Sequence, residues 1–231
     1  MPASRDRALL IGGLAAFAGG AVVARQRGVT QIEQRCFELV NGLSHRGYPL
    51  VWLPMQLGNL AGPLVVGAVL RATGHRRLGA RVAAVGTVTW VAAKALKPVG
   101  RRGRPAHTVP ATRVLGQAQA GLGYPSGHAA VAAATAAVVA PHLTRRARPV
   151  AWAVALAVGP MRGYVGAHLP LDVFGGVALG VALGAAAGPG DVGGCSRAER
   201  PSGQRARHGL RVAIWRGSTS STARPTGDAA R

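Results

Sequence analysis

Six apolar stretches, separated by short basic or polar segments, constrain the fold of this chain more than any other feature of its sequence. They consist mainly of Ala, Val, Leu and Gly and cover roughly residues 8–24, 50–70, 78–96, 129–143, 150–166 and 171–188. Several approach the ~20 residues that a helix needs to cross the hydrocarbon core of a bilayer, whereas the fourth is short. We therefore expect an all-α integral membrane bundle of about six transmembrane helices.

Composition supports the membrane assignment. Hydrophobic residues make up 48% of the chain and charged residues only 15%, against about 25% charged in a typical globular protein. The net charge of +21 comes from arginines that lie in short clusters between apolar stretches and near the C-terminus. A nucleic-acid-binding domain would need these charges on a solvated folded face, and six spans leave little room for one. We therefore expect no nucleic-acid partner.

The segments outside the central spans suggest three regions. The first apolar stretch follows Arg5 and Arg7 and ends in small residues, so it is either an uncleaved helix, which we favour, or a signal peptide. Thr30 and Glu33 have capping-box spacing and open a short amphipathic helix expected to lie on the membrane surface. We divide the chain into an N-terminal transmembrane helix (1–29), a membrane core (30–188) and a basic C-terminal tail expected to be disordered (189–231).

Glycine spacing predicts one close helix contact. Gly176, Gly180, Gly184 and Gly188 recur every four residues and so share one face of the last predicted helix. Such a face lets another helix approach closely. Cys36 and Cys195 fall on opposite sides of the membrane in this topology, and neither a disulfide framework nor a metal site is expected.

Three polar clusters interrupt the apolar pattern. They contain Lys97 with Arg104-Pro105, then Pro125-Ser126-Gly127-His128, and finally Arg162, His168 and Asp172. With the N-terminus inside, the loop that holds Lys97 and Arg104 lies outside and is basic, contrary to the positive-inside rule. This exception indicates that some of its charges are kept for chemistry. We expect Arg101, Arg102 and Arg113 from the same region to be interfacial anchors that reach toward lipid headgroups.

The residue types in these clusters suit phosphoryl transfer. A phosphate ester is dianionic near neutral pH and needs several cationic donors in place, which Lys97, Arg104 and Arg162 supply. Ser126 and the backbone N–H of Gly127 would begin a helix whose N-terminus favours the same anion.

Two histidines and a carboxylate would then perform the chemistry. His168 and Asp172 are four residues apart and would share a helix face, so the carboxylate can orient the imidazole as a nucleophile. His128 would act as the general acid, and a phosphohistidine is the expected intermediate.

The three clusters resemble the signature of the type 2 phosphatidic acid phosphatase family, which shares a core with vanadium haloperoxidases. Lys97, Arg104 and Pro105 match the first motif, Pro125 to His128 the second, and Arg162, His168 and Asp172 the third. Met161 stands where the family usually has Ser, which removes one possible hydroxyl contact to phosphate.

The resemblance covers roughly residues 30–188 and implies a function. It implies hydrolysis of a lipid phosphate or pyrophosphate without a metal or other cofactor, in the plasma membrane, with the active site facing the extracytoplasmic side. The expected partners are the lipid substrate and the membrane, and no obligate protein partner is inferred. A catalytically impaired protein that binds lipid phosphate is the alternative. A soluble haloperoxidase-type enzyme is disfavoured by the apolar spans.

Overall fold

The computed structural model describes residues 4–188, and this part of the chain is helical without any β-strand. The ten α-helices within it are α1 (Ser4–Gln26), α2 (Gln31–Asn41), α3 (Tyr48–Met55), α4 (Ala61–Ala72), α5 (Arg76–Ala95), α6 (Lys97–Gly100), α7 (Pro105–Thr108), α8 (Gly127–Val139), α9 (Ala147–Tyr164) and α10 (Pro170–Ala186). Short 3-10 turns cover His45–Gly47, Gln56–Gly58 and Ala140–His142. The predicted all-α class is confirmed. The predicted tail and Cys195 lie outside the described residues.

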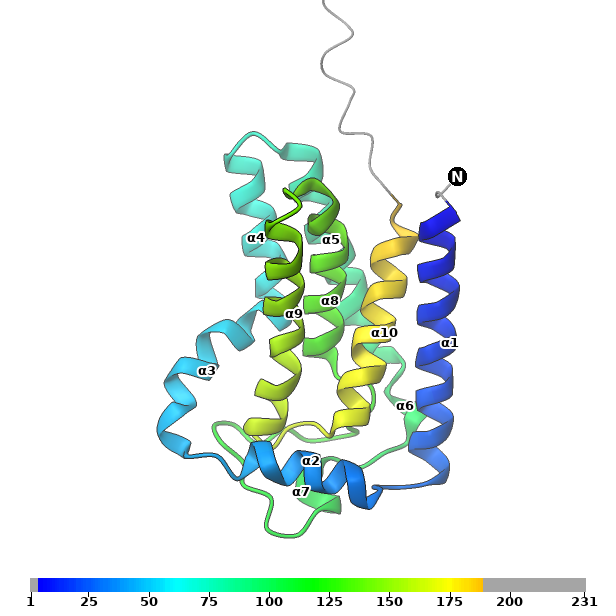
Figure 1. Cartoon of the computed structure of the whole chain (residues 1–231), viewed down its shortest axis with the longest axis vertical. Coiled ribbons are helices and arrows are strands. Elements are labelled where there is room, and N and C mark those ends of the chain that lie inside the picture. Colours follow the sequence, from blue (N-terminus) through cyan, green and yellow to red (C-terminus); the bar gives the residue numbers. More distant parts are fainter. Residues whose placement is uncertain (1–3, 189–231) are drawn as a thin grey trace, which may run out of the picture. The chain divides into compact units, whose positions relative to one another are not determined.

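The long helices form a bundle, and α2 lies across one end of it (Figure 1). Within the bundle, α10 packs against both α1 and α8, while α5 packs against α4 and α8. Helix α9 ends and α10 begins at the end of the bundle that α2 covers (Figure 1). The segments that carry the predicted motifs are therefore brought to a common end of the bundle.

Two helical stretches, Ser4–Gln26 and Arg76–Thr108, are long and apolar enough to cross a membrane. The second predicted stretch is broken, because its two halves, His45–Gly58 and Ala61–Ala72, meet at 71° and would count as a third span only if taken together. Pro54 lies inside the first of these halves, where it removes a backbone donor. Helix α10 is apolar but shorter, so six spans remain a prediction.

The surface helix α2 has the amphipathic pattern expected from its sequence, with one exception. Ile32 and Leu39 lie opposite the buried Glu33 and Asn41 and are 77% and 75% exposed. Phe37 is the exception, because it is buried on the same face as Glu33 and Asn41. The apolar face is thus free to contact lipid, and the polar face meets buried polar groups of the bundle.

Glycines allow α10 to contact α8 closely, as their spacing predicted. A Cβ atom at Gly176 or Gly180 would overlap the carbonyl oxygen of Ser126 or Ala130, respectively. A Cβ atom at Gly184 would lie 2.5 Å from the Cβ of Ala137. Gly188 does not belong to this face, because it follows the end of α10 with a φ of +67°.

A glycine-to-alanine pair tests this contact. Because a methyl group at Gly180 would overlap the backbone of α8, we expect Gly180→Ala to lower the free energy of unfolding by roughly 1–3 kcal/mol. The matched control is Gly19→Ala in α1, where a Cβ meets nothing within 4 Å and alanine favours the helix by up to about 1 kcal/mol. Thermal unfolding in detergent measures both, and equal melting temperatures would contradict the proposed close packing.

Candidate active site

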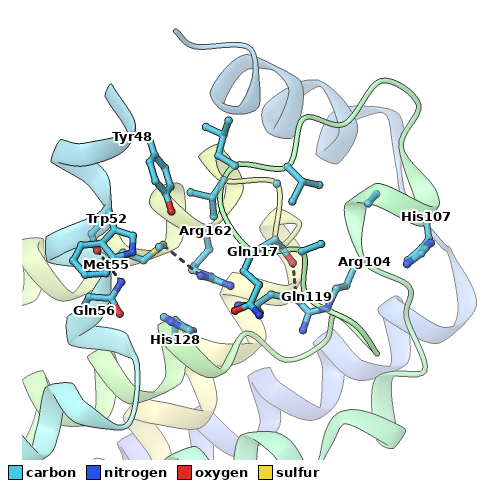
Figure 2. Close-up of a pocket in the computed structure, with 17 residues that line it drawn as sticks. Tyr48, Trp52, Met55, Gln56, Arg104, His107, Gln117, Gln119, His128 and Arg162 are labelled. Atoms are coloured by element: carbon cyan, nitrogen blue, oxygen red, sulfur yellow. Dashed lines mark hydrogen bonds between the residues drawn. The ribbon is translucent and has the colours of Figure 1, made fainter. Parts of the chain in front are cut away.

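The three predicted clusters meet around two adjoining cavities at the covered end of the bundle. The first, of about 330 Å³, is lined by Arg104, His128 and Arg162 among others (Figure 2). The second, of about 260 Å³, is lined by Lys97, Arg104, Gly127, His128 and His168 together with residues of α5. Arg104, Gln119 and His128 line both cavities. Lys97 and His168, which are 71 positions apart in the sequence, thus line one cavity.

Lys97 and Arg104 are held by backbone carbonyl groups on either side of the second cavity. Lys97 begins α6, and its ammonium group donates to the carbonyl oxygens of Leu122 at 2.8 Å and Pro125 at 3.4 Å. Arg104 precedes α7, and its guanidinium donates to the carbonyl oxygens of Ala120 and Ala167 at 3.2 and 3.0 Å. Lys97 also has the carbonyl oxygen of Gly123 at 3.5 Å, so acceptors are present for all three of its N–H donors. Arg104 keeps further N–H donors for a ligand.

Arg162 is the least satisfied cation of the site. It lies in the last turn of α9 and is only 3% exposed. Its Nη1 contacts the thioether sulfur of Met55 at 3.4 Å, whereas its Nε and Nη2 are buried and have no hydrogen-bond partner within the described residues. Burying an unpaired charge is costly, and the guanidinium fork matches a phosphate or carboxylate. The first cavity therefore has the character of an anion site.

The loop that leads to His128 is anchored by Tyr124. Its ring is fully buried beside Phe17 of α1, at 5.6 Å between ring centroids, and its hydroxyl group donates to the carbonyl oxygen of Phe17. Glycines make room for the ring, since a Cβ atom at Gly20 or Gly100 would lie 2.7 Å from it. This packing fixes the entry into α8.

Ser126 and His128 then begin α8 in different roles. Ser126 is the N-cap, and its hydroxyl oxygen accepts from the N–H of Ala129 at 3.5 Å. It lines neither cavity, so its contact with phosphate remains a prediction. Gly127 and His128 do line the second cavity. The positive end of α8 is thus directed toward the site.

His168 and Asp172 are neighbours, although not on one helix as predicted. Pro170 begins α10, so His168 belongs to the preceding loop and Asp172 to the first turn. His168 Nδ1 lies 3.5 Å from Asp172 Oδ2, and that oxygen accepts from the N–H of Leu169 at 3.0 Å. Both side chains are almost fully buried. Asp172 therefore caps the helix and lies beside the imidazole at ion-pair distance, beyond that of a normal hydrogen bond.

The environment keeps the His168 ring neutral. Burial lowers the pKa of His168 well below its usual value, and the charges of Arg162 and Arg104 lower it further. A neutral imidazole has a free nitrogen lone pair, which a nucleophile requires. The site thus combines a neutral histidine with an adjacent cationic cavity.

Arg102 and Glu33, which lie near the His168–Asp172 pair, were not among the predicted site residues. Arg102, expected to be a lipid anchor, is 3% exposed and forms an ion pair with the buried Glu33. Its Nη1 also lies 3.6 Å from Asp172 Oδ1. The only indication in the sequence that a buried arginine would pair with Glu33 was the small number of acidic residues.

Arg113 is likewise not an anchor, because its side chain donates to the carbonyl oxygens of Asn41 and Leu43. Arg101 is exposed, as expected.

Other lining residues could not be found from motifs. Trp52, Gln56, Gln117 and Gln119 contribute aromatic and amide groups to the first cavity. Met161 does not line it but packs against an apolar cluster that includes Met55 and Tyr164. Among residues 4–188 no group of three or more His, Cys, Asp or Glu side chains gathers in a way that could hold a metal ion.

An anion-binding measurement tests the cationic cavity independently of any reaction. Arg162→Lys keeps the charge but loses the planar fork, so we expect it to weaken orthovanadate binding by about 10-fold or more, corresponding to the 1.5–3 kcal/mol of a charged hydrogen bond. Arg145→Lys, at an exposed position, should leave the affinity unchanged. Isothermal titration of the purified protein measures both, and an unchanged affinity for the Arg162 variant would remove this residue from the anion site.

Comparison with known proteins identifies the fold family. The PAP2 superfamily model matches residues 77–188. A transmembrane PAP2-type phosphatidylglycerolphosphate phosphatase from Bacillus subtilis is similar in structure, with a TM-score of 0.65 and 21% identity over 78% of this chain and 94% of that one. LpxE from Aquifex aeolicus is also similar, with a TM-score of 0.59 and 22% identity over 66% of this chain and 92% of that one.

At these identities the two structures establish the shared fold alone. Curated protein sequences give no match to the chain. The superfamily match covers all three motif clusters, from before Lys97 to beyond Asp172. Residues 77–188 are therefore assigned as a PAP2 superfamily domain.

Proposed function

We propose that this protein is a membrane phosphatase that hydrolyses a lipid phosphomonoester or pyrophosphate through a phosphohistidine intermediate. The observation that carries the proposal is Arg162, whose buried guanidinium lines the same cavity as His128 and has two nitrogen donors without a hydrogen-bond partner among the described residues. One protein of similar fold is a transmembrane PAP2-type phosphatidylglycerolphosphate phosphatase. The apolar helices α1 and Arg76–Thr108 supply the membrane setting.

The first chemical step is transfer of the phosphoryl group to His168. His128 first takes up a proton, which the negative charge of the bound phosphate favours. His168 Nε2 then forms a bond to phosphorus while the bond from phosphorus to the leaving oxygen breaks, and His128 gives that oxygen its proton. Asp172 stabilises the positive charge that develops on the imidazole ring. Lys97, Arg104 and Arg162 stabilise the negative charge on the phosphoryl oxygens. A free lipid alcohol, or a lipid monophosphate from a pyrophosphate, leaves the site.

The second step returns the enzyme to its starting state. His128 takes a proton from water, the water oxygen attacks phosphorus, and the phosphorus–nitrogen bond breaks to release phosphate and neutral His168. Because three side chains supply the positive charge that the transition state needs, we propose that no metal is required. By resemblance we also place the site on the extracytoplasmic side of the plasma membrane.

The neutral part of the first cavity favours a hydroxylated headgroup. Its volume of about 330 Å³ leaves room beyond one phosphoryl group. In the view of Figure 2, Gln117 and Gln119 lie between Arg162 and Arg104, and Tyr48 and Trp52 stand on the opposite side. Amides and aromatic rings suit hydroxyl groups better than a bare prenyl chain. We therefore propose a lipid whose phosphate is attached to a polyol, such as phosphatidylglycerol phosphate.

The catalytic proposal predicts complete dependence on His168. His168→Ala should lower phosphate release by at least ~10³-fold, as loss of a triad member does, while orthovanadate still binds because the arginines remain. His75→Ala is the control, since His75 is exposed and lines neither cavity. Release is measured in detergent with a chelator present, from phosphatidic acid, phosphatidylglycerol phosphate, undecaprenyl pyrophosphate and a water-soluble phosphoester.

The alternative function is binding of a lipid phosphate without turnover. Well-folded protein that binds vanadate but releases phosphate from no substrate would support it. Loss of release only when the chelator is present would instead overturn metal independence.

The headgroup proposal has its own test. Gln117→Ala should raise the KM for phosphatidylglycerol phosphate by about 3–10-fold, the value of one hydrogen bond, and leave the KM for phosphatidic acid unchanged. Gln31→Ala, exposed on α2, is the control. An equal change for both lipids would show that Gln117 does not recognise the headgroup.

A further inference from the structure

Glu33 of the surface helix connects directly to the residues behind the nucleophile. Its Oε1 accepts from Arg102 Nη1 at 2.8 Å and from the backbone N–H of Leu171, in the first turn of α10, at 2.9 Å. Its Oε2 pairs with Arg102 Nη2, which also donates to the carbonyl oxygen of Gly28 at 2.7 Å. Glu33 thus holds both Arg102 and the start of the helix that carries Asp172.

Arg102 lies between two carboxylates but bonds only one of them. Its distance of 3.6 Å to Asp172 Oδ1 exceeds a normal hydrogen bond. Asp172 Oδ1 is buried without a hydrogen-bond partner in the described part of the chain, while Oδ2 faces His168 and Leu169. The guanidinium charge of Arg102 therefore stabilises Asp172 from the Oδ1 side. It leaves Oδ2, the oxygen that lies nearest the His168 imidazole, without a hydrogen bond from Arg102.

The Glu33 carboxylate has different hydrogen-bond partners from the one that its local sequence predicts. In a complete capping box its carboxylate would return to the N–H of Thr30. Thr30 does cap α2, with its hydroxyl oxygen accepting from Glu33 N–H at 3.2 Å, but the Glu33 carboxylate points into the bundle instead. The Glu33 residue is 9% exposed, and its carboxylate does not bind the N–H of Thr30. The contacts that this carboxylate makes in the bundle therefore stabilise it.

We propose that Glu33 and Arg102 are positioning residues that set the orientation of Asp172, and through it the nucleophile His168. This inference rests on the proposed phosphatase function. Glu33 holds the guanidinium fork of Arg102 on the side away from the reaction. Without that carboxylate, the fork is free to form a bidentate pair with Asp172 and draw it from His168. The imidazolium of the phosphohistidine then loses its counter-charge.

A purely structural ion pair would behave differently. Its loss would lower stability and the fraction of active protein, but each folded molecule would react at the normal rate. A positioning pair instead lowers kcat per folded site and leaves substrate binding nearly intact, because neither Glu33 nor Arg102 lines the two cavities. The split between kcat and KM therefore separates the two roles.

The experiment compares Glu33→Gln, Arg102→Lys and the double variant with the wild type. Glu33→Gln keeps the size and an oxygen for Leu171 but removes the charge, and Arg102→Lys keeps the charge but removes the fork. The controls are Glu38→Gln, exposed on the same helix, and Arg101→Lys, exposed beside Arg102. Phosphate release is normalised to the number of orthovanadate-binding sites, so that unfolded protein is not counted.

We expect each single change to lower kcat by about 10–100-fold, as loss of an orienting partner does, with KM and vanadate affinity within about threefold of the wild type. The double variant should be no slower than the slower single variant, because both act through Asp172. Both controls should match the wild type. If neither Gln nor Lys variant retains vanadate sites, Glu33→Asp replaces them and should show a smaller drop in kcat at full site number.

Three results would overturn the inference. They are an unchanged kcat per vanadate site, a rise in KM at constant kcat, and additive losses in the double variant. Failure of the proposed function is recognised separately, because the wild type itself would then release no phosphate or His168→Ala would retain activity. In that case the inference, which depends on the reaction, fails with it.

Discussion

The site depends on the close packing of α8 against α10. Both helices begin at the same end of the bundle, and the backbone N–H of Ser126 donates to the carbonyl oxygen of Asp172 at 2.8 Å. Because this bond joins their two first turns, the segment with His128 cannot shift without the segment with Asp172. The absence of side chains at Gly176 and Gly180 is what permits the approach. Small residues in α10 therefore fix how closely the segment with His128 lies to the segment with Asp172.

Charge is the second constraint, because the site concentrates cations in a chain with few carboxylates. Arg104 and Arg162 are buried beside His168, and each lowers the pKa of its imidazole. Within residues 4–188, the buried carboxylates that oppose this positive charge are those of Asp172 and Glu33. Asp172 lies beside His168, whereas Glu33 pairs with Arg102. The excess of positive charge would therefore favour the binding of a phosphate group.

The sequence predicted the helical class and the gathering of the motifs, and it failed where tertiary contacts decide. Apolar stretches and four-residue glycine spacing report local periodicity, so α1, α5 and the α8–α10 contact were predictable. The inward face of α2 was not, because Glu33 is buried only through the presence of Arg102, 69 positions away. Likewise His168 and Asp172 were assigned to one helix from their spacing, although Pro170 begins α10 between them. The roles of Arg102 and Gln117 could not be predicted, because they depend on which loops lie next to each other in the folded protein.

The enclosure of Tyr124 makes the first helix a part of the catalytic architecture. Its hydroxyl group finds its acceptor on Phe17, 107 residues earlier in the chain, and its ring is covered by the glycine surfaces of α1, α6 and α10. Removing α1 would leave a buried phenol without an acceptor and open a void beside the loop that leads to His128. The packing of this loop is therefore complete only when α1 and the middle of the chain have come together.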